Sequence, residues 1–341
     1  MILKKLKDCF AYFKKINFSK KDIIYLASSI ILSIVLLIPV NYTITVGGGV
    51  IDLNKYITVS NRKDNNGFNA CYVKELNGTV FSYILGVIVP SYEITPLSDV
   101  TLSNEDKKSL EERERSYFTS SLDNATIVAY KYANKFIKIV EENLYVSYID
   151  ERANTNIKIG DKIKKIDGVK INTFSDIEKV LSRFDVDDLV DIIVERNNKD
   201  KKCFVKLINI NNSRKMGVSI ITTYDYDLDP KISFKFSNKE TGPSGGLMVS
   251  LTIYNQLIDR DITKGKKISG TGTIDINGNV GEIGGVKYKL LAAYKNNSDI
   301  FIVPYENLDE ALKIKKENGY DIEIIGVSSF KEAIEKLEKI N

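Results

Sequence analysis

Histidine is absent from all 341 residues of this chain. Its absence excludes the Ser–His–Asp triad, the Cys–His pair and most zinc sites, because each of them depends on an imidazole nitrogen. An enzyme of this sequence that attacks with a nucleophile needs another general base, and lysine is the usual alternative. We expect neither a metal nor a cofactor.

Cysteine is scarce, with three residues in the whole chain. Cys9 lies near the N-terminus, and Cys71 and Cys203 are far apart in the sequence. Two cysteines do not make a disulfide framework. Cys71 and Cys203 either form a single bridge or are two unrelated buried thiols.

A basic domain is also missing. The formal net charge is +4, but the first 22 residues carry seven lysines against two aspartates. The charge of the chain is therefore concentrated in this basic tail, and the remainder sums to about −1. Nucleic-acid-binding domains are usually strongly basic, so we expect no nucleic-acid partner.

Ile23 to Val40 is an uncharged, apolar stretch of 18 residues, close to the shortest length that spans a bilayer as a helix. Lysines precede it and none follows until Lys55. This asymmetry predicts a transmembrane helix over 23–40, with residues 1–22 as a cytosolic tail and the rest outside the cytosol, at the cell membrane. A cleaved signal peptide would instead give a secreted hydrolase. The long preceding segment and the lack of an A-x-A-like site favour the retained anchor.

Residues 41–136 are expected to form an extracytoplasmic β-rich and helical segment. The stretches "ITVGGGVIDL" and "ACYVKELNGTVFSYILGVIVP" alternate apolar and polar residues, and Asn77-Gly78 predicts a hairpin turn. The charged stretch from Ser103 to Phe136 is typical of helices.

Residues 137–211 are expected to be a small β-rich domain with one short helix beginning near Thr173 or Ser175. Strands are predicted at 189–196 and 203–208. In "IKIGDKIKKIDGVKI" (157–171), glycines allow turns between strands, and four isoleucines are predicted core residues. These are Ile159, Ile163, Ile166 and Ile171. This stretch resembles bacterial PDZ domains, which bind peptides as an added strand. The stretch "EENLYV" (141–146) corresponds to the carboxylate-binding loop of that family but lacks its glycines.

Residues 212–341 show an α/β pattern. A helix is predicted from about Ser244 to Asp259, and Asn277-Gly278 predicts a type I′ hairpin turn. A second helix follows Gly285, and strands and helices then alternate to the end. The fold class is therefore α/β (α+β), with an N-terminal transmembrane helix and a β-rich middle domain.

Ser244 lies in "TGPSGG", directly before an apolar helix. It is either an ordinary helix N-cap or a nucleophile at a helix N-terminus, where free N–H groups can stabilise an oxyanion. The flanking glycines would let a substrate backbone approach closely.

A lysine can act as a general base if burial or positive potential lowers its pKa. Lys287 and Lys289 in "GEIGGVKYKLLAA" both lie in the first turns of a predicted helix. The pattern of residues by itself does not choose between them.

The motifs "GPSGGL" and "GTGTIDINGNVGEIGGVKYKLLAA" together resemble the proteolytic domain of Lon-type peptidases, which use a Ser–Lys dyad. By position, the resemblance implies that Ser244 is the nucleophile and Lys287 the general base. It also matches Thr271 to a threonine that helps to orient the lysine. A homo-oligomer is one arrangement that the resemblance implies. The sequence has no G-x-x-x-x-G-K-[ST] motif, so the ATPase of the large Lon proteases is not expected.

The order of segments resembles bacterial membrane-anchored PDZ-domain serine peptidases of the Lon type. The resemblance implies an ATP-independent endopeptidase (212–341) that cleaves peptides or unfolded proteins, with the PDZ domain selecting substrate or gating the site. The alternative is a non-catalytic PDZ scaffold. Its sign would be a Ser244 and a Lys287 that lie too far apart to hydrogen-bond, or a Lys287 that is fully solvated.

Overall fold

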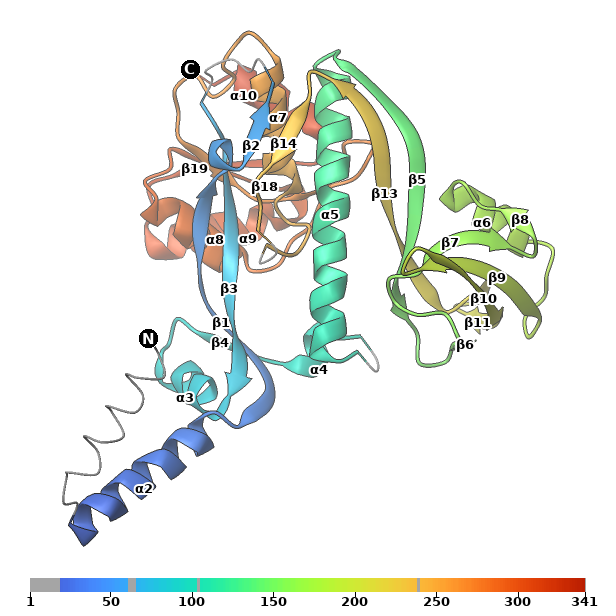
Figure 1. Ribbon diagram of the computed structural model, residues 1–341. Helices are drawn as coiled ribbons and strands as arrows, with labels where there is room; N and C mark the ends of the chain where they lie inside the picture. The colour runs from blue at the N-terminus through green and yellow to red at the C-terminus, as the bar shows by residue number, and fades with distance from the viewer. Residues whose placement is uncertain (1–18, 61–65, 103–104, 238–239, 341) are drawn as a thin grey trace, which may run out of the picture. The chain divides into compact units, whose positions relative to one another are not determined.

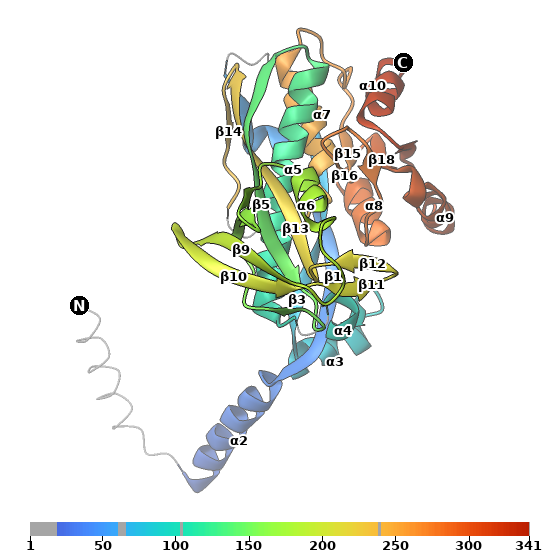
Figure 2. The ribbon, with the colours of Figure 1, turned by 90° about the vertical axis from the view of Figure 1, so that its right-hand side faces the viewer.

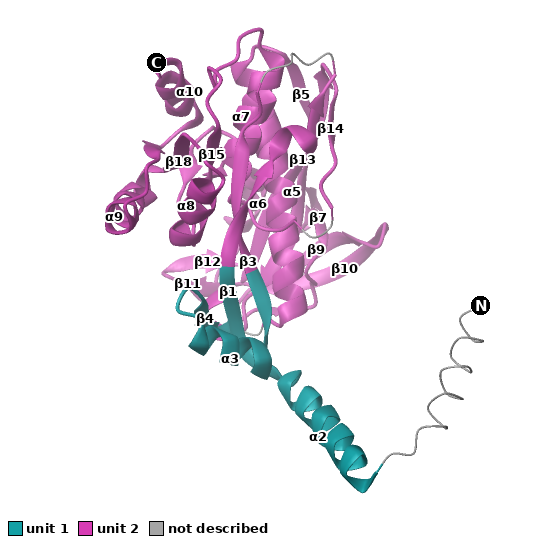
Figure 3. Cartoon of the chain, turned by 90° about the vertical axis from the view of Figure 1, so that its left-hand side faces the viewer, with its two compact units in different colours: residues 1–46, 75–97 teal, residues 47–74, 98–341 magenta. Residues whose placement is uncertain are grey.

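The computed structural model describes residues 19–60, 66–102, 105–237 and 240–340 (Figure 1). The predicted tail over 1–22, with Cys9, lies almost entirely outside these ranges. The chain divides into two compact units (Figure 3). The smaller unit contains residues 1–46 and 75–97, and the larger one contains residues 47–74 and 98–341.

The smaller unit begins with helix α2 (Lys20–Leu36), which Ser19 caps through a capping box with Asp22. The predicted helix over 23–40 is wrong at its C-terminal end, because Pro39 begins strand β1 (Pro39–Asp52). Proline lacks an N–H group and disfavours a helical residue before it. Among the described residues, no helix combines the length and the apolar character needed to cross a membrane.

The predicted hairpin at Asn77-Gly78 is also wrong. Both residues lie inside strand β3 (Asn69–Thr79), and helix α3 (Val80–Ile88) follows directly. Thr79 and Ser82 form a capping box that begins the helix. A Cβ on Gly78 would lie 1.9 Å from the carbonyl oxygen of Tyr42, so the glycine serves a close approach of two backbones. Strand β4 (Glu93–Pro96) pairs antiparallel with β1.

The larger unit contains a sheet in the order β19-β18-β15-β3-β1. Strands β15 (Ile268–Gly270), β18 (Ile300–Pro304) and β19 (Glu323–Val327) are parallel, as is the pairing of β15 with β3. Along β18, Ile300 and Ile302 belong to one core cluster, and Phe301 and Val303 belong to another. Both faces of this strand are therefore buried, which explains its uninterrupted apolar sequence.

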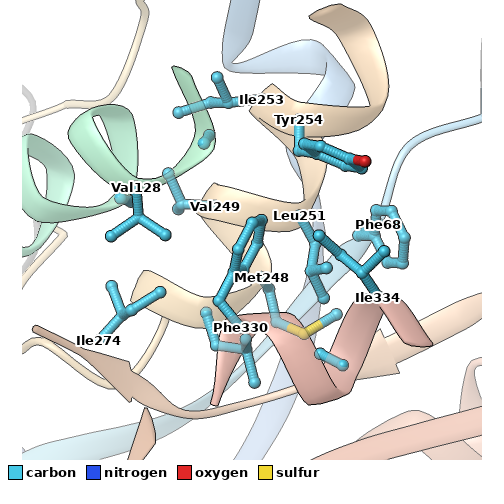
Figure 4. Close-up of a cluster of buried hydrophobic side chains, with 14 of the residues drawn as sticks. Phe68, Val128, Met248, Val249, Leu251, Ile253, Tyr254, Ile274, Phe330 and Ile334 are labelled. Carbon is cyan, nitrogen blue, oxygen red and sulfur yellow. The ribbon is translucent and has the colours of Figure 1, made fainter. Parts of the chain in front are cut away.

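Four helices belong to this α/β region, namely α7 (Gly246–Leu257), α8 (Val286–Lys295), α9 (Leu308–Asn318) and α10 (Phe330–Glu338). Every residue of α7 is buried. Figure 4 shows its side chains between Val128 of helix α5 (Lys107–Tyr132) on one side and Phe330 and Ile334 of α10 on the other. The predicted helix over 244–259 is thus confirmed, although it is shorter at both ends.

The predicted hairpin at Asn277-Gly278 is present between β16 (Thr273–Ile274) and β17 (Val280–Gly281). Its connection spans residues 275–279, and Asp275 accepts hydrogen bonds from Asn277 and Asn279. A type I′ turn needs positive φ at both central residues, but Asn277 does not have it and Gly278 does. The turn type was therefore predicted wrongly.

The β-rich region forms a sheet in the order β13-β5-β7-β9-β10-β6, and β8 pairs with β7. The long strands β5 (Phe136–Ile149) and β13 (Val218–Asp229) pair antiparallel over their whole length. The predicted core residues Ile163, Ile166 and Ile171 are buried, whereas Ile157 is buried in place of Ile159. The remaining elements here are β6 (Asn154–Thr155), β7 (Lys162–Ile166), β8 (Val169–Lys170), α6 (Phe174–Leu181), β9 (Leu189–Arg196), β10 (Lys199–Lys206), β11 (Ile208–Ile210) and β12 (Ser213–Lys215).

The stretch 141–146 is not a loop. It lies inside β5, where Glu141 accepts a hydrogen bond from the Lys162 ammonium group and Glu142 accepts one from the Phe174 N–H. The expected correspondence of this stretch with a carboxylate-binding loop is therefore wrong.

Helix α5 (Lys107–Tyr132) lies alongside β5, β13 and α7 (Figure 2). It begins at Asp106, whose side chain accepts a hydrogen bond from the Ser109 N–H. The remaining elements of the chain are η1 (Leu53–Lys55), β2 (Ile57–Val59), α4 (Leu97–Val100), β14 (Ile232–Phe234) and η2 (Tyr305–Asn307).

Candidate active site

Ser244 lies in a turn that ends just before α7. Gly242 has a φ of +80°, which favours glycine, and Pro243 follows it. The N-cap of α7 is Gly245, and no side chain caps this helix. The Ser244 hydroxyl is therefore not a helix cap, which removes the ordinary structural explanation for this serine.

Hydrogen bonds from two elements hold the Ser244 turn. The Gly272 N–H and the Thr271 hydroxyl both donate to the carbonyl oxygen of Ser244, at 2.7 and 3.0 Å. From α5, the Ser121 hydroxyl donates to the Pro243 carbonyl oxygen, and the Glu114 carbonyl oxygen accepts the Gly242 N–H. The backbone on both sides of the serine is thus fixed before any substrate arrives, which is what catalytic positioning requires.

Thr271 has a different role from the expected one. It is fully buried, and its hydroxyl donates to the backbone of Ser244. Thr271 was expected to orient the lysine, but this hydrogen bond contacts the serine backbone. Thr271 instead positions the serine.

Lys289 is the lysine at this site. Its Nζ atom lies 3.0 Å from the Ser244 Oγ atom, and the residue is only 3% exposed. Lys289 is the fourth residue of α8, which begins after Gly285 in the left-handed region (φ +70°). The side chain lies at hydrogen-bond distance from the serine hydroxyl, as a nucleophile–base pair requires.

The structure contradicts the choice of Lys287 over Lys289. Lys287 is exposed, and its Nζ atom lies over the ring of Tyr288, 5.7 Å from the ring centre. Residues three and four apart share a helix face, so Lys289 lies on the same face as Val286 and Ala293, which are both buried. The sequence held no signal that separates the two lysines, since Leu290, three residues after Lys287, is buried as well.

Burial sets the electrostatics of the pair. Burial lowers the pKa of Lys289 to about 8, and a thiolate at the nearby Cys71 would act in the opposite direction. Burial also raises the pKa of the Cys71 thiol to about 12, so this group stays protonated and neutral. A lysine with a pKa near 8 is partly unprotonated near neutral pH and can accept a proton.

The N–H groups around Ser244 that could stabilise an oxyanion can be identified from their hydrogen bonds. The Gly242 N–H already donates to Glu114, and Pro243 has no N–H. The Gly246 N–H donates to the Pro243 carbonyl oxygen. Within the described ranges, no acceptor is paired with the N–H groups of Ser244 and Gly245. These two groups at the N-terminus of α7 are the candidates.

Cys71 and Cys203 are both free and buried. They are two unrelated thiols, one near Lys289 and the other beside Arg196 in the β-rich region. Over the part of the chain that the structure describes, no cluster of three or more His, Cys, Asp or Glu side chains could hold a metal ion.

Residues 237–339 match the family model of the Lon protease (S16) C-terminal proteolytic domain. The chain carries a Lon-type proteolytic domain. Residues 128–207 match the PDZ domain model. The PDZ domain of an SdrC-like protein from Listeria monocytogenes is a similar solved structure, with 19% identity and a TM-score of 0.22. The matched region covers 24% of this chain and 92% of that structure.

Relatives with curated names are Lon proteases. Lon protease 2 of Borreliella burgdorferi is 26% identical over 217 residues, which is 60% of this chain and 25% of the relative. The Lon protease of Campylobacter jejuni is 37% identical over 95 residues, which is 28% of this chain and 12% of the relative. The chain therefore spans a quarter or less of the length of these two relatives.

The two glycines after Ser244 are expected to differ sharply on replacement by alanine. A Cβ on Gly246 would lie 2.5 Å from the Ser121 Oγ atom and 2.9 Å from a methyl carbon of Ile274. Gly246→Ala should therefore lower the free energy of unfolding by about 1–3 kcal/mol and displace the hydroxyl that holds Pro243. Urea unfolding and casein cleavage measure the two effects.

Gly245→Ala is the matched control for stability. Its Cβ would meet only the Ala70 Cβ atom, at 4.0 Å, and its φ of −93° suits any residue. Unfolding of this variant should coincide with that of the wild type. Equal stability of both variants would show that the close contact at Gly246 does not exist in solution.

Proposed function

We propose that this chain is an ATP-independent serine endopeptidase with a Ser244–Lys289 dyad. The observation that carries the proposal is the 3.0 Å distance between the Ser244 Oγ atom and the Lys289 Nζ atom, inside a domain that matches Lon proteases. The sign expected for the scaffold alternative, a solvated Lys287 away from Ser244, is present. We nevertheless favour the peptidase, because Lys289 lies at hydrogen-bond distance from Ser244 where Lys287 was expected.

The mechanism follows from the positions of these groups. Neutral Lys289 takes the proton of the Ser244 hydroxyl while the Oγ atom attacks the scissile carbonyl carbon. The N–H groups of Ser244 and Gly245 stabilise the oxyanion that forms. Lys289 then gives its proton to the leaving amine, and the C–N bond breaks to leave an acyl-enzyme. A water molecule, deprotonated by Lys289, attacks the ester and restores the serine.

The proposal of ATP independence rests on the sequence, which has no G-x-x-x-x-G-K-[ST] motif in its 341 residues. Without a motor that unfolds proteins, the substrates are flexible segments or unfolded proteins. We expect the full chain to cleave casein, an unfolded protein, with no nucleotide present, and to cleave it at the same rate when ATP is added. Gel electrophoresis over time measures this. Cleavage that begins only with ATP would refute the nucleotide-independent part of the proposal.

We further propose that the PDZ domain selects the peptides that reach the site. The support is the match of residues 128–207 to a domain family that binds extended peptides. The partners of the chain would then be peptide or unfolded protein substrates. We also propose that copies of the chain assemble into a homo-oligomer.

Attachment to the cell membrane through residues 23–40, with the catalytic domain outside the cytosol, is also a proposal. Its support is the uncharged stretch that follows the basic tail, and the exposure of the apolar side chains of α2. Full-length protein is expected in the membrane fraction after alkaline extraction. Recovery of the intact chain in the soluble fraction would contradict it.

A further inference from the structure

Helix α3 (Val80–Ile88) exposes its apolar side. Four large apolar side chains are between 42% and 68% exposed, namely Phe81, Ile84, Val87 and Ile88. They lie on one face of the helix, because residues three and four apart are neighbours on a helix surface. An apolar face of this kind usually packs into the core of a protein. Its exposure here indicates that something else covers it.

The other side of α3 packs on the strands of its own unit, where α3 contacts β4 (Figure 3). Ser82 on this side is only 4% exposed. A Cβ on Gly86 would lie 2.6 Å from a side-chain carbon of Ile94 in β4, so a glycine lets the helix approach the strand closely. Small residues therefore face the smaller unit, and the large apolar ones face away from it.

The segment around α3 carries no charge. Residues 76–92 contain no Asp, Glu, Lys or Arg, although these make up 28% of the whole chain. An ionised side chain is costly in the apolar part of a bilayer. A long uncharged segment with an exposed apolar helix therefore suits contact with lipid.

Helix α3 begins where α2 ends. The Val80 N–H donates to the Ile38 carbonyl oxygen at 3.0 Å, and Ile38 directly follows Leu37, the C-cap of α2. The two helices belong to the same compact unit, and the apolar side chains of α2 are exposed as well (Figure 3). A bilayer that takes up α2 would therefore extend to the first turn of α3.

Two tyrosines lie next to this junction. Tyr83 of α3 and Tyr42 of β1 have ring centres 5.0 Å apart, and Tyr42 comes shortly after Ile38 in the chain. Tyrosine is enriched where lipid meets water, because its ring is apolar and its hydroxyl is polar. The pair is consistent with a membrane surface at the junction of α2 and α3.

We propose that α3 is a second membrane-binding element, which lies in the bilayer interface with its four exposed apolar side chains among the lipid chains. This inference rests on the proposed attachment through residues 23–40. An interfacial helix needs no spanning length, so the nine residues of α3 are enough. Lipid is favoured over a second copy of the chain, because α2 brings the bilayer to this end of the unit. Two contacts with the bilayer would hold the smaller unit in one orientation on the membrane.

The test places an environment-sensitive fluorophore at one position of the full chain at a time. Ile31→Cys reports on α2 and Val87→Cys reports on α3, since these side chains are 62% and 66% exposed. Glu93→Cys is the matched control, because Glu93 is an exposed, charged residue of β4 in the same unit.

Cys9 is replaced by serine in every chain, and the buried Cys71 and Cys203 remain. The labelled chains are reconstituted into vesicles of phosphatidylcholine and phosphatidylglycerol, with and without nitroxide-labelled lipid. Labelling of a chain without an added cysteine measures the background from the buried thiols.

We expect nitroxide lipid to remove most of the emission from Val87→Cys and to leave that from Glu93→Cys unchanged. Adding Ile84→Glu and Ile88→Glu to the Val87→Cys chain should restore the emission, because carboxylates are costly among lipid chains. Both isoleucines are exposed, so the thermal unfolding of the chain should not change. Equal quenching at Glu93→Cys, or quenching that persists with the two glutamates, would overturn the proposal.

The labels separate this inference from the proposed attachment. Quenching at Ile31→Cys without quenching at Val87→Cys would overturn the role of α3 and leave the anchor standing. Quenching at Val87→Cys alone would refute the anchor and leave α3 on the membrane, and quenching at neither position would refute both. Emission from Val87→Cys that resists both nitroxide lipid and aqueous iodide would mean that a second copy of the chain covers this face, which would overturn lipid as the partner.

Discussion

Lys289→Ala is expected to lower the rate of casein cleavage at least ~1,000-fold, because members of a nucleophile–base pair act as a unit. Ser244→Ala should lower it equally, and the double variant should lose no more than either single one. The reason is the 3.0 Å contact between the two side chains, which no other lysine of the described chain makes with Ser244. Initial rates on labelled casein measure the effect.

Lys287→Ala is the matched control, since this lysine lies two residues away on the same helix and is exposed. It should cleave casein at a rate close to that of the wild type. Loss of activity in Lys287→Ala together with activity in Lys289→Ala would return the role of base to Lys287.

Stability separates a chemical role of Lys289 from a structural one. The pKa of Lys289 is near 8 in the folded chain against an ordinary 10.5. Burying the charged form therefore costs on the order of 3 kcal/mol below pH 8, and the cost disappears as the pH rises from 8 towards 10.5. Lys289→Met should thus be inactive but at least as stable as the wild type at pH 7. An inactive variant that has also unfolded would leave the chemical role unproven.

The rate of cleavage should rise steeply with pH up to about 8. The base must be unprotonated, and a group with a pKa of about 8 is unprotonated in roughly 1% of molecules at pH 6 and half of them at pH 8. The expected increase in kcat/KM between these values is about 50-fold. Initial rates with a short peptide in buffers of constant ionic strength measure it.

The pH profile has an internal control. The unfolding midpoint, followed over the same pH range, should change little, through the linkage of Lys289 and of Asp123, whose pKa burial raises to about 6. A flat profile between pH 6 and 8 in a folded protein would contradict Lys289 as the general base. A rate profile whose midpoint lies near pH 10 would mean that the lysine is solvated in solution.

Local patterns predicted the elements that depend on neighbouring residues. The helix after Gly285 begins at Val286 and contains the site lysine, because glycine at positive φ followed by helix formers determines the start locally. The Asp-Gly turn of the β-rich domain contains Gly168 at φ +75°, as its sequence suggests. The hairpin at Asn77-Gly78 was predicted wrongly. Glycine is needed at position 78 because the backbone of Tyr42, which is distant in sequence, passes too close for a Cβ atom.

The sequence by itself excluded catalysis by histidine, predicted Ser244 at a helix start, and limited the proposed base to two lysines in one helix. Which lysine it is depends on the face of α8 that packs into the core, and only the tertiary structure decides that. The same holds for the cavity beside Ser244, which is lined by residues as far apart in the sequence as Tyr56, Phe118 and Phe236. Spacing along a chain fixes local geometry, whereas burial, and with it the pKa of Lys289, arises from segments that meet only on folding.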